Sequence, residues 1–124
     1  MKKIITLICS VLFLILSIFT LGGCDNRPVL KMATSADFPP FENKEGNKYV
    51  GIDIEIAQKI ADELGYKLEI VNMDFDSVVT SISQGIADFA MAGLTVKEDR
   101  KIHVDFTDSY FDAAQFVIVK KDTS

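Results

Sequence analysis

The chain has 124 residues, of which 18 are acidic and 13 are basic, and its formal net charge is −5. It contains no basic patch or Lys/Arg run that could neutralise phosphates, which argues against nucleic-acid binding. The two cysteines, Cys9 and Cys24, both precede the segment that we expect to fold, so this segment has no disulfide and no thiolate metal ligand.

The first 24 residues have the features of an export signal. Two lysines precede an uncharged, mostly apolar run over residues 4–21. The run ends in LGGC, which resembles a lipobox, where Cys24 would be acylated and become the new N-terminus. The alternative is an uncleaved anchor, but 18 residues form only about 27 Å of helix against a bilayer core of about 30 Å. We therefore predict a lipoprotein signal peptide over residues 1–23 and a lipid-anchored tether over residues 24–28.

Cleavage after residue 23 would leave 11 basic and 18 acidic residues, a formal net charge of −7. About 100 residues would remain, which is enough for one hydrophobic core and not for two. We therefore expect a single folded unit after the tether.

This unit begins with a strand signal and continues with a loop and a helix. Val29 to Thr34 is an apolar-rich run and predicts a buried strand. The stretch SADFPPFENKEGN contains two prolines and a glycine, and it is predicted as a loop. Residues 52–56 alternate like a strand, but the longer helical period predicts a helix from Asp53 to Leu64, followed by Gly65 at a position suited to positive φ.

The second half repeats the alternation. Lys67 to Asn72 is predicted as a strand, and Asp74 or Asp76 can cap a second helix. Phe89 to Met91 is predicted as a short third strand, and Phe116 to Val119 as a last one. The apolar face of the second helix is assigned to Val78, Val79, Ile82 and Ile86, with Gly85 near its end. This order of elements predicts an α/β fold with a mainly parallel sheet flanked by helices.

The stretch AGLTVKEDR, residues 92–100, is the first candidate for a binding site. Thr95 to Glu98 has the T-x-x-E form of a capping box, and a helix that starts there would direct its N–H groups toward an anion. Gly93 lets a ligand approach the backbone, and Arg100 can hold a carboxylate with two hydrogen bonds. The simpler interpretation is a cap, a turn and a surface charge.

Four blocks of sequence add a resemblance to a known family. In order and spacing, ATSADFPPFE, YVGIDIEIAQKIADELG, MDFDSVVTSISQGIADFAMAGLTVKEDR and VDFTDSYF resemble the first lobe of the polar amino-acid-binding proteins that serve ABC importers. The resemblance implies a periplasmic-binding-protein-like lobe over residues 29–121, and a hinge that begins at residues 122–124 and is cut short. The second lobe is expected to be absent.

The resemblance also implies a role for each site residue. Arg100 would pair with the α-carboxylate of a free amino acid, and Thr95 would add its hydroxyl and N–H. Gly93 would accept from the α-ammonium through its carbonyl, with Ala92 beside it. Phe38 would stack on the ligand and Phe75 would line the pocket for its side chain; ordinary core packing is the alternative for both aromatics.

Ser35 is a departure from the family pattern. Several members place an Asp at this position, where it reads the ligand side chain, so a basic or amide ligand cannot be assumed from Ser35. A single lobe would also leave the ligand open to water, and the Arg100 interaction would then resemble an exposed ion pair of about 0–1 kcal/mol. We expect weak binding or none by this chain alone.

The implied function is reversible solute binding outside the cytoplasm, with a membrane permease and its ATPase as partners. No cofactor and no metal are expected, and the chain is expected to be a monomer held at the membrane by its lipid.

An enzyme is the contrasting class, because related two-lobed folds include dehydratases; a sensor domain or a non-binding fragment are further alternatives. His103 is the only histidine and is predicted to lie on the surface or at a helix end, so an acid–base pair is not evident, and we predict no enzymatic activity. Asp74 and Asp76 do not continue into the pattern of an EF-hand.

Overall fold

The computed structural model describes residues 26–114 and 116–121 of the chain. The predicted signal peptide and Cys24 lie outside the described residues, as do residues 122–124. Within the described part, no helix is long and apolar enough to cross a membrane.

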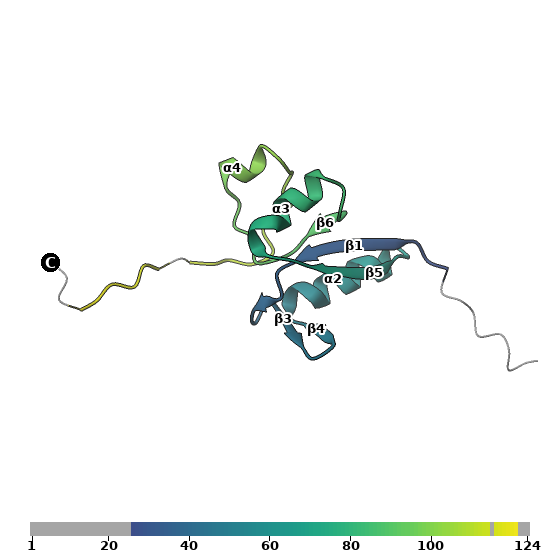
Figure 1. Cartoon of the computed structure of the whole chain (residues 1–124), viewed down its shortest axis with the longest axis horizontal. Helices are drawn as coiled ribbons and strands as arrows, with labels where there is room; N and C mark the ends of the chain where they lie inside the picture. Colours follow the sequence, from purple (N-terminus) through teal and green to yellow (C-terminus); the bar gives the residue numbers. More distant parts are fainter. Residues whose placement is uncertain (1–25, 115, 122–124) are drawn as a thin grey trace, which may run out of the picture.

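The centre of the fold is a parallel sheet of three strands in the order β5-β1-β6 (Figure 1). The strands are β1 (Val29–Thr34), β5 (Lys67–Asn72) and β6 (Phe89–Ala90). β1 pairs with β5 along its whole length, from Val29 opposite Lys67 to Thr34 opposite Asn72. The predicted strands β1 and β5 are confirmed, and the α/β class with a parallel sheet is confirmed with them.

One long helix packs on each face of this sheet, because successive side chains of β1 point to opposite faces. Met32 packs with Ile54 and Ala57 of α2 (Ile52–Glu63), and its neighbour Ala33 packs with Val78 of α3 (Phe75–Ser83). The helix predicted over residues 53–64 is confirmed within one residue, and Gly65 has the expected positive φ of 74°. α3 ends at Ser83, so Ile86 lies beyond it. Asp74 occupies the N-cap position of α3 without a side-chain capping bond.

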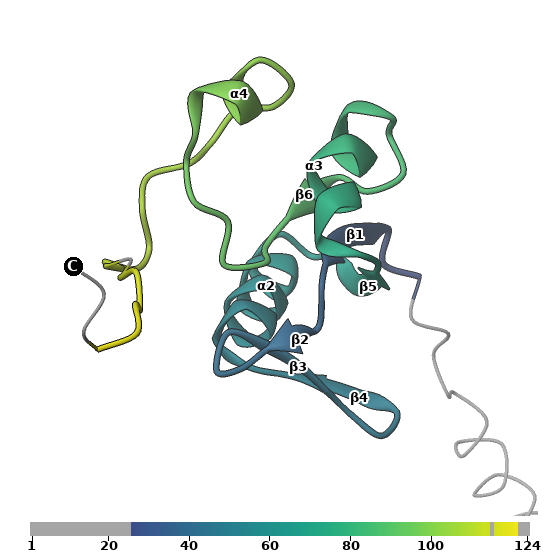
Figure 2. The same ribbon diagram turned by 60° about the vertical axis from the view of Figure 1, so that its left-hand side comes forward.

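The loop predicted for SADFPPFENKEGN is wrong in part, because six of its thirteen residues belong to two strands of a small antiparallel sheet. Its strands are β2 (Asp37–Phe38), β3 (Glu42–Glu45) and β4 (Lys48–Val50), in the order β2-β3-β4. Figure 2 shows this sheet beside α2. The two prolines lie between β2 and β3, where neither has to donate to the ladder, and Gly46 takes the positive φ of the β3–β4 turn. Short polar strands of this kind carry no apolar alternation, so the sequence pattern did not indicate them.

Two further predictions are corrected by the structure. The last helix, α4, covers only Glu98–Lys101 and has Lys97 at its N-cap, so Thr95 lies before the helix and does not cap it. A one-turn helix also has little dipole to offer an anion. The strand predicted for Phe116 to Val119 does not form; these side chains are 68–95% exposed and lie on an extended segment that leaves the lobe (Figure 1). β-branched residues form a strand only beside a partner strand, and none of the described strands pairs with them.

Candidate functional site

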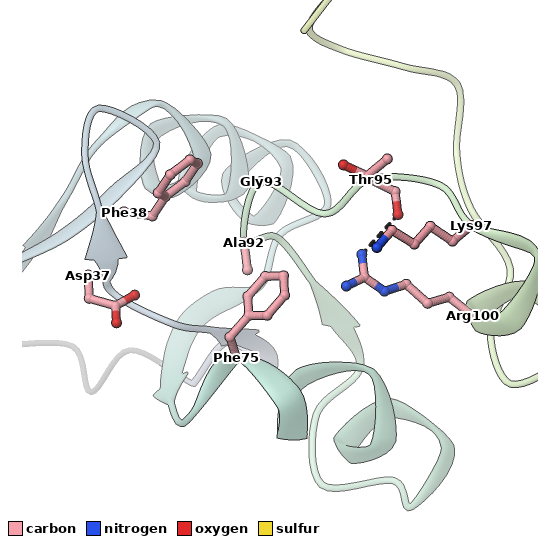
Figure 3. A pocket seen from close by; sticks show the side chains of 8 residues that line it. All are labelled: Asp37, Phe38, Phe75, Ala92, Gly93, Thr95, Lys97 and Arg100. Carbon is pink, nitrogen blue, oxygen red and sulfur yellow. Dashed lines mark hydrogen bonds between the residues drawn. The ribbon is translucent and has the colours of Figure 1, made fainter. Parts of the chain in front are cut away.

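A pocket of about 380 Å³ lies where the carboxyl ends of the three parallel strands meet (Figure 3). The chain leaving β1 supplies Asp37 and Phe38, and the turn after β5 supplies Phe75 at the start of α3. The chain leaving β6 supplies the remaining lining residues, which are Ala92, Gly93, Thr95, Lys97 and Arg100. In open α/β sheets, crevices at this edge are the usual ligand sites, because every loop that leaves a strand there contributes side chains.

The pocket has opposite charges on two sides. Figure 3 shows the Asp37 carboxylate on one side and the cationic ends of Lys97 and Arg100 on the other. The guanidinium of Arg100 lies 5.3 Å from the ring centroid of Phe75, and its Nη1 donates a hydrogen bond of 2.9 Å to the carbonyl oxygen of Thr95. Thr95 thus holds Arg100 in place through its main chain. A guanidinium held in this way can still offer its remaining N–H groups to a carboxylate.

Gly93 lies where side chains of several elements converge. Its φ is 54°, and a Cβ at this position would lie 3.2 Å from two ring atoms of Phe38. Its N–H donates a 3.0 Å hydrogen bond to Oδ2 of Asp53, in the first turn of α2. The backbone conformation therefore favours glycine here, and the ring of Phe38 leaves little room for a Cβ.

Six of the seven residues assigned from the sequence line this pocket: Phe38, Phe75, Ala92, Gly93, Thr95 and Arg100. Ser35 is the exception, because it is buried and does not belong to the lining. Its hydroxyl donates a hydrogen bond of 3.1 Å to Oδ1 of Asp37. Ser35 therefore orients a carboxylate that does reach the pocket.

Four residues of the site were not predicted from the sequence: Asp37 and Lys97 in the lining, and Asp53 and Tyr110 behind Gly93. Asp37 and Lys97 lie close in sequence to Phe38 and Thr95, which were assigned, so this proximity along the chain could have indicated them. Asp53 offered another signal, since it falls on the apolar face of α2 although it is charged. His103 is exposed beyond the end of α4 and does not line the pocket. Among the described residues, no cluster of His, Cys, Asp and Glu could hold a metal ion.

A buried acidic pair lies behind the pocket. Asp53 and Glu42 are both fully buried, and Asp53 accepts hydrogen bonds from Gly93 N–H and from the hydroxyl of Tyr110. The carboxyl oxygens of Glu42 have no hydrogen-bond partner within the described structure. Burial, and then the charge of Asp53, raise the pKa of Glu42 from an ordinary 4.5 to about 8. Burial and the bond to Asp53 also raise the pKa of Tyr110, so its hydroxyl stays a donor.

A lobe of this kind, with a pocket at the carboxyl edge of a parallel sheet, is that of the periplasmic-binding-protein-like amino-acid binders. The chain belongs to the bacterial extracellular solute-binding proteins, family 3, whose family model matches residues 30–124. It is 40% identical over 102 residues to the arginine-binding extracellular protein ArtP of Bacillus subtilis (strain 168), a match that covers 82% of this chain and 40% of that protein.

Two further comparisons bear on the site. The arginine-bound form of domain 1 from TmArgBP superposes with a TM-score of 0.65 and 44% identity, covering 68% of each chain. A cyclohexadienyl dehydratase of Pseudomonas aeruginosa is 31% identical over 83 residues, which are 66% of this chain and 31% of that enzyme. The chain spans about a third to a half of the length of the relatives that bind arginine.

The raised pKa of Glu42 predicts a pH dependence of stability. The unfolded chain releases this proton near pH 4.5, whereas the folded chain keeps it up to about pH 8. The stabilising contribution is therefore complete below about 4.5 and is lost as the pH rises to about 8. In Glu42→Gln, which is neutral at every pH, we expect thermal unfolding to lose less stability between about pH 5 and about pH 9 than in the unchanged protein. Glu45→Gln, an exposed position on the same hairpin, is the control; equal pH profiles for all three proteins would contradict the prediction.

Proposed function

We propose that this chain forms the ligand-holding first lobe of an extracytoplasmic amino-acid-binding protein, and that it binds a free amino acid reversibly. The observation that carries the proposal is the distribution of charge in the pocket. Arg100 lies on one side and Asp37 on the other, and the rings of Phe38 and Phe75 belong to the same lining. A zwitterion needs donors and acceptors that converge within a few ångströms, and aromatic faces confine its carbon stem.

The roles follow from the position of each group. Arg100 and the N–H and hydroxyl of Thr95 receive the α-carboxylate, and the carbonyl of Gly93 accepts from the α-ammonium. Phe38, Phe75 and Ala92 enclose the stem of the ligand. Phe38 and Phe75 are 54% and 41% exposed, so a ligand that packs on their rings covers apolar surface that water now contacts. This gain is available to a single lobe.

We further propose a cationic amino acid such as arginine as the ligand. Asp37 lies across the pocket from Arg100, and the hydroxyl of Ser35 donates a hydrogen bond to its carboxylate (Figure 3). Relatives that bind arginine support this class of ligand. The arginine-bound form of domain 1 from TmArgBP also supports binding by one lobe, although we expect it to be weak here.

The family name supports a location outside the cytoplasm, and we propose a lipid anchor on Cys24 and an ABC permease with its ATPase as partners. Mature protein purified from bacterial membranes should begin at Cys24 and carry a mass increment of thioether-linked diacylglycerol on that residue. Cys24→Ala should keep the uncleaved N-terminus. A mature protein of unmodified mass would contradict the anchor without bearing on the pocket.

A second candidate is a dehydratase, because one relative is such an enzyme. A general acid would have to reach the substrate, and the lining of this pocket offers one carboxylate, Asp37, and no histidine. Incubation with a cyclohexadienyl substrate, followed by chromatography, separates the two functions: release of an aromatic product would favour the enzyme, and unchanged substrate favours binding.

The binding proposal predicts that Arg100 is required for affinity. Calorimetric titration of the protein in mild detergent with arginine should show saturable binding, and Arg100→Ala should weaken it by up to about fivefold, because a charge-assisted contact that stays open to water contributes up to about 1 kcal/mol. Arg100→Lys keeps the charge but loses the planar fork and the stacking on Phe75, and should restore only part of the affinity. Equal affinity of Arg100→Ala and the unchanged protein for arginine would contradict the proposed role of Arg100 in binding the α-carboxylate.

The assignment of Asp37 predicts a change in ligand preference. In Asp37→Asn, affinity for arginine should fall by about threefold to tenfold, as expected for a partly exposed charge pair, while affinity for glutamine should stay within about twofold. Glu45→Gln serves again as the control for loss of one negative charge. A parallel loss for both ligands would show that Asp37 shapes the pocket without reading the side chain.

A further inference from the structure

The described residues after α4 form no helix or strand, yet two of them, Tyr110 and Phe111, contact the lobe. The hydroxyl of Tyr110 lies 2.9 Å and 3.0 Å from the two carboxylate oxygens of Asp53. Local hydrogen bonds brace the same segment, since the hydroxyl of Ser109 donates to the carbonyl of Phe111 over 2.9 Å. Tyr110 is 47% exposed and Asp53 is fully buried, so the hydroxyl reaches inward from the surface. The segment is thus tied to the lobe by a charge-assisted hydrogen bond.

This bond continues to the pocket. Oδ2 of Asp53, one of the two oxygens within reach of Tyr110, also accepts the N–H of Gly93 over 3.0 Å. Removal of the Tyr110 hydroxyl would leave a buried carboxylate with one donor fewer, and Asp53 would then have to move or to draw in water. Either change alters the position of Gly93, which lines the pocket.

A second route starts at the neighbouring residue. The ring of Phe111 packs edge-on against Phe41, with centroids 4.9 Å apart and an interplanar angle of 86°. Phe41 in turn stacks on Phe38 at 5.7 Å and 11°. The ring of Phe38 lies beside Gly93, where a Cβ would come within 3.2 Å of two ring atoms. Two adjacent residues of the segment therefore reach the same point of the pocket by independent chains of contacts.

We propose that Tyr110 and Phe111 are positioning residues of the amino-acid site, which hold Gly93 and Phe38 in place from behind the pocket. Binding of the amino acid and docking of residues 107–112 onto the lobe then favour each other, since a coupling free energy acts equally in both directions. This inference rests on the function proposed above. It adds that displacement of residues 107–112 from the lobe lowers the affinity for the amino acid, although these residues lie outside the pocket.

The test compares Tyr110→Phe and Phe111→Ala with two matched controls. Tyr66→Phe removes a hydroxyl beyond the end of α2, and Phe116→Ala removes a ring that is 86% exposed. In arginine titrations, each test variant should lose about tenfold in affinity, within the usual range of coupling between sites, and each control should bind like the unchanged protein. Tyr110→Phe should also shift the amide resonance of Gly93 in the ligand-free protein, which a merely destabilising substitution would not do selectively.

Hydrogen exchange measures the converse effect, which is how ligand binding changes the docking of residues 107–112. Arginine should slow exchange at residues 107–112 in the unchanged protein, and this protection should be lost in Tyr110→Phe. Test variants that bind arginine with unchanged affinity would overturn the proposal, as would a loss of affinity that the two controls share. An unchanged protein that binds no amino acid would refute the proposed function and this inference with it. The amide resonance of Gly93 separates failure of the proposed function from failure of this inference. It tests the contact between Tyr110, Asp53 and Gly93 in the absence of ligand.

Discussion

The hydrogen bond between the Asp53 carboxylate and the Gly93 N–H holds together parts of the chain that are 40 residues apart. A buried carboxylate is costly unless donors surround it, and here Gly93 and Tyr110 supply them. The neighbouring Glu42 avoids a second buried charge by keeping its proton, since burial and the charge of Asp53 raise its pKa to about 8. The Asp53 carboxylate, which accepts hydrogen bonds from two sides, thus connects α2, the loop after β6 and the segment after α4.

The parallel sheet decides where this connection lies. β1 is central and pairs in parallel with β5 and β6, so the three strands end at the same edge of the sheet. The loops leaving that edge carry Asp37, Phe75 and Arg100 from positions distant in sequence. The opposite charges of the pocket, Asp37 and Arg100, are therefore brought together by the strand order, because they are far apart along the chain.

Family membership leaves room for more than one activity, since its relatives include binding proteins and a dehydratase. Function follows from groups placed on the fold and not from the fold itself. In this lobe the lining groups are suited to holding charges and an apolar stem. Asp37 is the single carboxylate among them, and a hydrogen bond from the hydroxyl of Ser35 orients it.

Local pattern determined the regular core. An apolar run was sufficient for β1, alternation for β5 and helical periodicity for α2, because these signals come from residues that are close together along the chain. The resemblance of four sequence blocks indicated six of the lining residues and also Ser35, which lies outside the lining, but not Asp37 or Lys97. The tertiary structure decided the rest: the polar hairpin strands pair only with each other, Phe116 to Val119 has no strand beside it, and Thr95 precedes its helix although its motif resembles a cap. It also brought Asp37 opposite Arg100 and Tyr110 onto Asp53. Periodicity is a property of neighbours along the chain, whereas these contacts depend on which distant segments the sheet brings together.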